Sequence, residues 1–338
     1  MTSPETDPAT RPVRGPFLPG DRVQLTDPKG RLTTIELIPG KLHHTYRGTL
    51  AHDDLVGAPE GSVATTTGGV AYLALRPLLA DWVLSMPRGA AVVYPKDAAQ
   101  IVAMADIYPG ARVIEAGAGS GGLTMSLLRA VGEGGSLLSV ERRPEFAAIA
   151  RANVEAFFGA PHPAWRLEIG DFAEVVAREA QTHPIADRVI LDMLAPWENL
   201  DAAAVALEPG GVFLAYVATT TQLSRLAEAL RDSGLFTEPT AWENMVRGWH
   251  LEGLAVRPEH RMVGHTGFLI STRRMAPEVA PPRRSRRPAP GAYGEVNEDG
   301  QRPTLFPDED WSEEDLGIRP TSPRKLRRVA RKAQSRTS

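Results

Sequence analysis

The stretch VIEAGAGSGGLT, residues 113–124, connects an apolar run that ends at Glu115 to a glycine-rich turn and the beginning of a helical pattern. Glycine lets the backbone bend tightly and approach a ligand without side-chain interference, and four glycines stand in this turn: Gly117, Gly119, Gly121 and Gly122. Three of them have the spacing G-x-G-x-x-G, which is also the fingerprint of dinucleotide-binding proteins. The stretch predicts a strand, a cofactor-binding turn and a helix, and it leaves an NAD-dependent oxidoreductase open.

Strand-like and helical segments alternate on both sides of this stretch, from residue 97 to about 272. The strand-like runs are ARVIE (111–115), SLLSV (136–140), WRLEI (165–169), ADRVILDM (186–193), GVFLAYV (211–217) and TGFLIST (266–272). Residues 219–232 predict a helix that ends ahead of Gly234, as a helix stop signal requires. This alternation predicts βαβ units and a largely parallel sheet.

The region before this pattern reads differently. Residues 17–75 contain short extended pieces broken by turn residues, which predict a small all-β domain. In residues 71–86 apolar positions recur every three or four residues, which predicts a linking helix. We therefore assign residues 76–96 to a linker that contains this helix and the YPKD segment, and residues 97–275 to the α/β domain.

Both ends of the chain have the composition of disordered segments. Residues 1–16 are polar and rich in proline, and residues 276–338 are rich in Pro, Arg, Ser and acidic residues with few apolar anchors. The segment from residue 281 has 13 Lys and Arg against 9 Asp and Glu, whereas the preceding residues have 25 against 32. An acidic body thus has a basic tail.

Six of the positive charges in the tail fall within nine residues: Arg324, Lys325, Arg327, Arg328, Arg331 and Lys332. Such a cluster could contact phosphates, or it could be a solvated extension without a role. LRRVARKA could also form one amphipathic turn against another subunit.

Composition excludes several classes of protein. The chain contains no cysteine, which rules out a disulfide framework and a thiolate metal site. Its eight histidines show no metal-ligand spacing; His43 and His44 are expected on the surface of the small domain, and His260 and His265 could stabilise turns. We find neither a secretory signal nor the roughly 20 apolar residues that span a bilayer, and therefore expect a cytoplasmic protein without metal or membrane.

Carboxylates stand at or near the ends of four successive predicted strands. Glu115 ends the first, and Glu141, 24 residues after Gly117, follows the second, where it could accept hydrogen bonds from both hydroxyls of a ribose. Asp171 follows the third strand and could bind an adenine amino group or cap the next helix. With Asp192 on the fourth, this series favours an adenosyl cofactor over NAD.

Asp192 lies in RVILDMLAPWENL, where a buried strand delivers a carboxylate to its end. Such an arrangement is unfavourable unless something binds there. Helix capping is the simpler explanation, but Pro196 and Trp197 argue against it, since proline shapes the loop and an exposed indole could face a base.

Several motifs occur together and in order: GDRVQLTDPKGR (20–31), DDLVG (53–57), VYPKDAAQI (93–101), IEAGAGSGGLT (114–124), LDMLAPWE (191–198) and VGHTGFL (263–269). Over residues 17 to about 274 the chain resembles the tRNA adenine-58 N1-methyltransferase family, in its bacterial homotetrameric branch. The glycine turn is shared by many methyltransferases, whereas YPKD with DMLAPWE and HTGFL is specific. No motif residue departs from the family pattern; only the long C-terminal tail does.

The resemblance implies a class I methyltransferase domain, Rossmann-like with a seven-stranded mostly parallel sheet, after a small all-β domain. It implies S-adenosylmethionine as cofactor, tRNA as partner and methylation of an adenine in the T loop. Asp192 is then the catalytic residue, and Tyr94, Trp197 and Tyr216 are candidates for the walls around the target base. The residues expected to bind the cofactor are Glu115, Gly117, Gly119, Ser120, Gly121, Gly122, Leu123, Glu141, Asp171 and Phe172.

Three alternatives stay open. A methyltransferase could act on a protein or a small molecule; an NAD-dependent oxidoreductase would share the glycine turn and Glu141 but leave Asp171 and the Asp192 loop unexplained. A non-catalytic RNA-binding protein could use the β domain and the basic tail, although neither the glycine turn nor the aspartate is missing.

Overall fold

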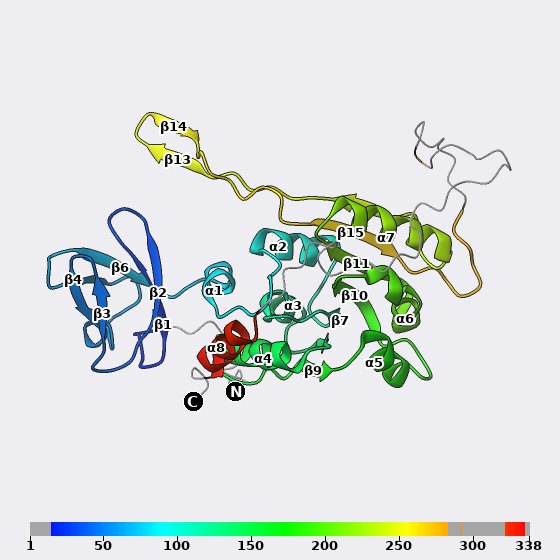
Figure 1. Cartoon of the computed structure of the whole chain (residues 1–338), viewed down its shortest axis with the longest axis horizontal. Helices are drawn as coiled ribbons and strands as arrows, with labels where there is room; N and C mark the ends of the chain where they lie inside the picture. The colour runs from blue at the N-terminus through cyan, green and yellow to red at the C-terminus, as the bar shows by residue number, and fades with distance from the viewer. Residues whose placement is uncertain (1–14, 283–291, 293–321, 335–338) are drawn as a thin grey trace, which may run out of the picture.

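The computed structural model describes residues 15–282, residue 292 and residues 322–334. The predicted disorder of residues 1–14, and of most of the segment after residue 282, lies outside this part of the chain. Figure 1 shows a small β domain, the larger α/β domain beside it, and a hairpin that projects from the larger domain.

The small domain is antiparallel, as predicted. Its four-stranded sheet has the order β2-β1-β6-β5, and a separate hairpin, β3-β4, lies against it (Figure 1). The strands are β1 (Arg22–Thr26), β2 (Leu32–Glu36), β3 (Leu42–Thr45), β4 (Gly48–Ala51), β5 (Val63–Thr65) and β6 (Ala71–Leu75), with the 3-10 helix η2 (His52–Asp54) after β4. Its core includes the fully buried Phe17, Val23, Leu25, Leu37, Leu50 and Leu55.

The predicted helix over residues 71–86 is wrong in its first part. Residues 71–75 form β6, whose side chains alternate between exposed and buried, and only Leu79–Ser85 form a helix, α1. Pro77 separates the two elements, since proline cannot donate to a sheet and its fixed φ suits a break before a helix. The leucines and alanines of this stretch fit both periods, so spacing alone did not distinguish them.

The larger domain contains a seven-stranded sheet of order β12-β15-β11-β10-β7-β8-β9. All six predicted strands are present: β7 (Arg112–Ala116), β8 (Ser136–Glu141), β9 (Trp165–Ile169), β10 (Ala186–Asp192), β11 (Leu207–Val217) and β15 (Phe268–Arg273). The seventh, β12 (Thr240–Trp242), was not predicted. β15 is antiparallel to its neighbours β11 and β12, whereas β7 to β11 run parallel. The mostly parallel seven-stranded sheet is therefore confirmed.

Helices cover both faces of this sheet (Figure 1). Side chains of α1, α2 (Pro95–Met104), α3 (Gly122–Val131) and α4 (Pro144–Phe158) enter the core on one face. Those of α5 (Phe172–Glu179), α6 (Leu200–Ala206) and α7 (Thr220–Ser233) enter the core on the other, with the 3-10 helix η3 (Pro196–Asn199) before α6. Among the described residues, no helix is long and apolar enough to span a membrane.

Two elements depart from the sequence predictions. A hairpin of β13 (Trp249–Glu252) and β14 (Ala255–Pro258) extends away from the α/β domain between β12 and β15 (Figure 1). Within the segment predicted to be a disordered tail, Pro323–Gln334 form a helix, α8, that packs on α4. The prediction of disorder is wrong for α8, because its few apolar residues fall on one face and are covered by the domain.

Candidate functional site

The glycine turn and Asp192 meet where the parallel strands end. Gly117, at φ 89°, lies against the backbone of Asp192 so closely that a Cβ on Gly117 would stand 1.8 Å from the Asp192 carbonyl oxygen. Only glycine permits this approach, in a left-handed conformation that it adopts without strain. The turn after β7 and the end of β10 thus form one wall, at the edge where ligands bind in open α/β sheets.

Glu115, at the end of β7, is completely buried. Its Oε2 accepts hydrogen bonds from the hydroxyls of Thr124 (2.7 Å) and Ser139 (2.6 Å), whereas Oε1 has no hydrogen-bond partner among the described residues. Burial raises the pKa of Glu115 to about 7, with a further contribution from Glu141. A buried carboxylate oxygen without a partner is unfavourable, and a cationic or hydrogen-bond-donating ligand would satisfy it.

Glu141, at the end of β8, is hydrogen-bonded to the glycine turn. Its Oε2 accepts from the backbone N–H of Gly119 at 2.9 Å, and its Oε1 accepts from that of Arg143 at 3.1 Å. The pKa of Asp192 is raised to about 7, chiefly because the carboxyl is buried. The negative charges of Glu115 and Glu141 raise it further. Three carboxylates at one edge favour a positively charged ligand.

The two residues at the end of β9 have structural roles. Asp171 caps α5, since its Oδ1 accepts from the backbone N–H groups of Ala173 (2.9 Å) and Glu174 (3.4 Å). This is the simpler of the two roles predicted for it, and it leaves Oδ2 available. The Phe172 side chain is buried in the core under the sheet, so only its backbone could meet a ligand.

The remaining residues of the turn face other elements of the protein. Ser120 Oγ accepts from the backbone N–H groups of Gly89 (3.2 Å) and Ala90 (3.4 Å). Gly121 packs on α4, Gly122 packs on α1, and Leu123 lies in the core. These residues shape the turn, and Gly117 and Gly119 are the ones that stand beside the carboxylates.

Tyr216 lies beside Asp192, and Tyr94 lies near Tyr216, which is the arrangement that walls around a base would need. Asp192 and Tyr216 are register partners on the parallel strands β10 and β11, and Tyr94 precedes α2. Burial raises the pKa of Tyr216 above its usual value, and the charge of Asp192 and the neighbouring Tyr94 act in the same direction. The Tyr216 ring lies on the backbone of Gly267, where a Cβ would stand 2.3 Å from its Cζ.

A buried network supports these aromatic residues, and its members were not predicted as site residues. Lys96 Nζ donates to Asp97 Oδ1 (2.7 Å), to the Asn244 carbonyl (2.6 Å) and to Thr266 Oγ1 (2.6 Å). Thr266 Oγ1 donates to Asp97 Oδ2 at 2.6 Å, and Thr266 lowers the pKa of Tyr216 whereas Asp97 raises it. Lys96 and Asp97 belong to YPKD and Thr266 to HTGFL, so the two motifs signalled the network, but their contact was not evident from one sequence.

Trp197 differs from the expectation of an exposed indole. Its partly buried ring packs on the core to which α5, α6 and α7 contribute, and the guanidinium carbon of Arg225 lies 4.5 Å from the ring centroid. Its Nε1 is buried without a hydrogen-bond partner among the described residues. Pro196 is also buried, so the loop after Asp192 packs against the domain at η3.

Among the four histidines with a predicted place, His44, His260 and His265 are exposed and His43 is half-buried, whereas His52 and His162 are buried. His265 Nδ1 lies 3.0 Å from Glu243 Oε2, and its ring packs on Phe268. No group of three or more His, Asp and Glu side chains among the described residues is placed to hold a metal ion.

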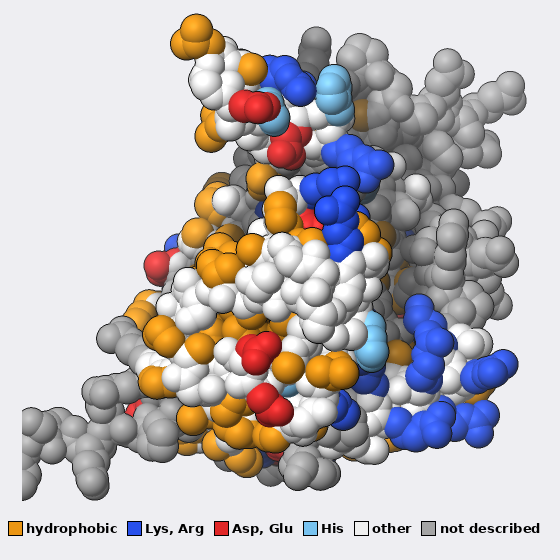
Figure 2. All heavy atoms as spheres, turned by 90° about the vertical axis from the view of Figure 1, so that its left-hand side faces the viewer, with side chains coloured by type: hydrophobic (Ala, Val, Ile, Leu, Met, Phe, Trp, Pro, Cys, Tyr) orange, Lys and Arg blue, Asp and Glu red, His pale blue; other side chains and the backbone are white. Residues whose placement is uncertain are grey.

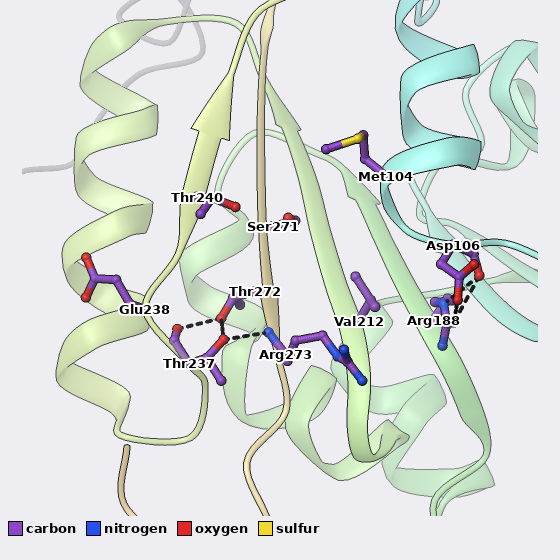
Figure 3. A pocket seen from close by; sticks show the side chains of 10 residues that line it. All are labelled: Met104, Asp106, Arg188, Val212, Thr237, Glu238, Thr240, Ser271, Thr272 and Arg273. Atoms are coloured by element: carbon purple, nitrogen blue, oxygen red, sulfur yellow. Dashed lines mark hydrogen bonds and ion pairs between the residues drawn. The ribbon is translucent and has the colours of Figure 1, made fainter. Parts of the chain in front are cut away.

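A cavity of about 340 Å³ lies at the opposite, amino-terminal end of the parallel strands (Figure 3). Arg188 and Arg273 line it, but Arg188 is paired with Asp106 at 3.0 Å and Arg273 Nε donates to the Gly210 carbonyl. Both arginines of this cavity are engaged within the protein, so the carboxyl edge remains the candidate site.

The residues at this edge fit S-adenosylmethionine. The carboxylates of Glu115 and Glu141 suit its positive charges, the free Oε1 of Glu115 offers an acceptor, and a Cβ on Gly119 would meet no atom closer than 3.7 Å. The fold and this site define a class I S-adenosylmethionine-dependent methyltransferase.

Comparison with known proteins gives the family. Residues 15–64 match the model described as TrmI-like N-terminal, and residues 69–253 match the model described as tRNA methyltransferase complex GCD14 subunit. The chain is 38% identical over 250 residues to the tRNA (adenine(58)-N(1))-methyltransferase TrmI of Thermus thermophilus, covering 74% of this chain and 95% of the relative. It therefore belongs to the tRNA adenine-58 N1-methyltransferase family.

Further similarities agree. A tRNA (adenine(57)-N(1)/adenine(58)-N(1))-methyltransferase of Methanocaldococcus jannaschii is 31% identical over 245 residues, covering 67% of this chain and 86% of that one. The structure of an S-adenosylmethionine-dependent O-methyltransferase from Thermotoga maritima is 30% identical with a TM-score of 0.72, covering 78% of this chain and 96% of that one. The Aquifex aeolicus tRNA (m1A58) methyltransferase TrmI has a TM-score of 0.67 at 24% identity, covering 78% and 100%, and supports the fold. Membership of this family excludes the oxidoreductase alternative.

Proposed function

We propose that this protein methylates N1 of adenine 58 in the T loop of tRNA, with S-adenosylmethionine as methyl donor. The observation that carries the proposal is the position of Asp192. Its backbone meets Gly117 of the cofactor turn, and its strand partner is Tyr216, with Tyr94 nearby. One carboxylate thus stands between a cofactor turn and two aromatic side chains that could hold a base.

The proposed chemistry is a direct transfer. S-adenosylmethionine supplies an electrophilic methyl group on a sulfonium. The lone pair of adenine N1 forms the new N–C bond while the S–C bond breaks with its electron pair remaining on sulfur, so the base becomes a cation. Asp192 accepts a hydrogen bond from the exocyclic amino group, orients N1 and stabilises the developing charge. No covalent intermediate with the protein is needed.

The base must leave the folded T loop before it can react, since N1 is on its Watson–Crick edge. Enzymes that modify such a base extrude it into a pocket and stack it on flat side chains. Tyr94 and Tyr216 are the proposed stacking residues. Trp197 is less suited to stack on the base, because its ring already packs against the core and Arg225. Gly117, Gly119, Glu115 and Glu141 are proposed to hold the cofactor.

The test is to locate the product. An unmodified tRNA transcript is incubated with the protein and S-adenosylmethionine, then digested, and the modified nucleoside is identified and placed in the sequence. We expect 1-methyladenosine at position 58 and none in a transcript with guanosine there. Methylation of another nucleoside, or of protein in place of RNA, would refute the substrate assignment.

We also propose a homotetramer, located in the cytoplasm, where tRNA is modified. The hairpin β13–β14 supports the assembly, because it leaves the domain and carries exposed apolar side chains: Trp249, Leu251, Leu254 and Val256 (Figure 2). Exposed apolar side chains gathered on one element are typical of a protein interface. Sedimentation should give a mass of four chains, and Leu251→Ser with Leu254→Ser should lower it. Leu32→Ser, in the small domain, is the control; a wild-type monomer would contradict the proposal.

A further inference from the structure

We propose that the outer face of α8 binds the phosphate backbone of the tRNA substrate beside the cofactor turn. This inference rests on the proposed function, because it takes tRNA to be the substrate. It concerns a helix outside both matched family regions, which are residues 15–64 and 69–253.

The inner face of α8 is fixed to the domain. Leu326, Val329 and Ala333 follow one another at spacings of three and four residues, so they share one face of the helix. Val329 and Ala333 are buried and Leu326 is half-buried. The helix packs on α4. The apolar residues of α8 are thus used for docking on the chain itself.

The docking point adjoins the cofactor turn. A Cβ built on Gly89 would stand 3.2 Å from Leu326 Cδ2 of α8 and 2.9 Å from Phe146 and Ile149 of α4. The backbone N–H of Gly89 in turn donates to Ser120 Oγ, in the glycine turn. Only one residue therefore separates α8 from the turn, and a phosphate held on α8 belongs to RNA that has reached the active-site edge of the domain.

The outer face is strongly basic. The helix contains no Asp or Glu. It has six positive side chains, all of them exposed: Arg324, Lys325, Arg327, Arg328, Arg331 and Lys332. Within the described residues, none of the first five of these forms an ion pair with a carboxylate. Arg88, next to Gly89, and Arg142, two residues before α4, are also exposed. Figure 2 shows Lys and Arg side chains gathered at its lower right, on the side where α8 lies.

Charge and packing favour RNA over the other partners of a basic helix. A membrane-surface helix must insert its apolar face into the lipid, and here that face is covered by α4 and Gly89. A polyanion such as RNA would contact only the outer, basic face of α8. The residues before position 281 have more acidic than basic side chains, so the attraction for RNA must come from local basic surfaces such as this one.

The experiment uses the full chain with four substitutions: Arg324→Gln, Arg327→Gln, Arg328→Gln and Arg331→Gln. Kd for an unmodified tRNA transcript is measured against salt concentration. Each lost phosphate contact reduces the slope of log Kd against log salt by about 0.7–0.9, so the slope should fall by roughly 2–4 and affinity at moderate salt by tenfold or more. Kd for S-adenosylmethionine should be unchanged, since Leu326, Val329 and Ala333 are retained.

The matched control replaces the same four arginines by lysine, which keeps the charges, and should retain most of the tRNA affinity. An unchanged slope in the glutamine variant would overturn the proposal, as would a changed oligomeric mass with unchanged tRNA affinity. The proposed function fails separately, if wild-type protein leaves adenine 58 unmodified. In that case RNA binding by α8 is still measured by the same titration.

Discussion

Asp192 and Glu115 each have a pKa raised to about 7, mainly by burial, so both carboxyls change charge near neutral pH. Below pH 7 a neutral Asp192 could not stabilise a cationic base. The raised values also affect folding. Since these carboxyls ionise at lower pH in the unfolded chain, the protein without cofactor should lose stability as pH rises from about 4 through about 7.

The first prediction is a pH profile. We expect kcat/KM for tRNA to rise between pH 6 and 8 and then to level off, because Asp192 ionises with a pKa of about 7. Asp192→Ala should lose most turnover together with the rise, while the dissociation constant of S-adenosylmethionine stays close to that of wild type. Wild-type kcat in this variant would exclude Asp192 as the catalytic residue.

Glu141→Ala should affect the cofactor. Its carboxylate would bind the ribose and also accepts from the Gly119 N–H, so its removal should weaken S-adenosylmethionine binding by about 1–3 kcal/mol. Calorimetric titration measures this change. Glu145→Ala, exposed in the first turn of α4, is the control and should bind normally. Equal dissociation constants for the two variants would show that Glu141 contributes nothing to cofactor binding.

Thr266→Val tests the network behind the base site. Valine keeps the shape of Thr266 but removes the hydrogen bonds to Asp97 and Lys96. Lost hydrogen bonds to charged groups are worth about 1.5–3 kcal/mol, so we expect kcat to fall by roughly tenfold or more, with unchanged cofactor affinity. Thr266→Ser should restore activity. A fall in thermal stability with normal kcat would indicate a purely structural network.

Helices and strands could be predicted from the sequence where the apolar residues repeat with the period of only one of the two structures. The five parallel strands and α7 were predicted within a few residues, since buried strands and an amphipathic helix have distinct patterns. Residues 71–75 were predicted as helix because their apolar side chains fit both periods. The hairpin β13–β14 was not predicted, since its exposed apolar residues lack a domain core to face.

The start of α7 gives a prediction on stability. Thr219 Oγ1 accepts from the Gln222 N–H at 3.1 Å, and Gln222 Oε1 accepts from the Thr219 N–H at 3.0 Å, which forms a capping box. Thr219→Ala should lower the free energy of unfolding by about 1 kcal/mol. Gln222 also donates to the Leu194 carbonyl, in the loop after Asp192. Denaturant unfolding measures the loss, and Thr219→Ser should be nearly neutral; equal destabilisation by both would contradict a capping role.

At the scale of the whole molecule, the sequence placed single residues of the site but not their contacts. Glu115, Glu141 and Asp192 could be assigned to strand ends from local pattern alone, and parallel topology then gathers them at one edge. The contact of Lys96 with Thr266, 170 residues apart, depends on the antiparallel insertion of β15 beside β11. Likewise, the packing of α8 on α4 depends on a surface that the local pattern does not describe.

The last prediction concerns removal of residues 277–338, which include α8. The sheet ends with β15 at Arg273, and the glycine turn, Glu141 and Asp192 lie outside the deleted part. We therefore expect the truncated protein to fold and to bind S-adenosylmethionine normally. Its melting temperature should fall by a few degrees, roughly 2–4 °C per kcal/mol, because Phe146, Ile149 and Gly89 lose the cover of Leu326.

Binding of tRNA should weaken and its salt dependence should flatten, because fewer counterions are released from the RNA. Kd is measured against salt for the full chain, the truncated chain and the chain with four arginines of α8 replaced by glutamine. The last two should have similar slopes if α8 supplies the phosphate contacts of the tail, whereas a flatter slope in the truncated chain alone would assign additional contacts to other residues of the tail. Superimposable curves for the full and truncated chains would mean that recognition rests wholly on residues 1–276.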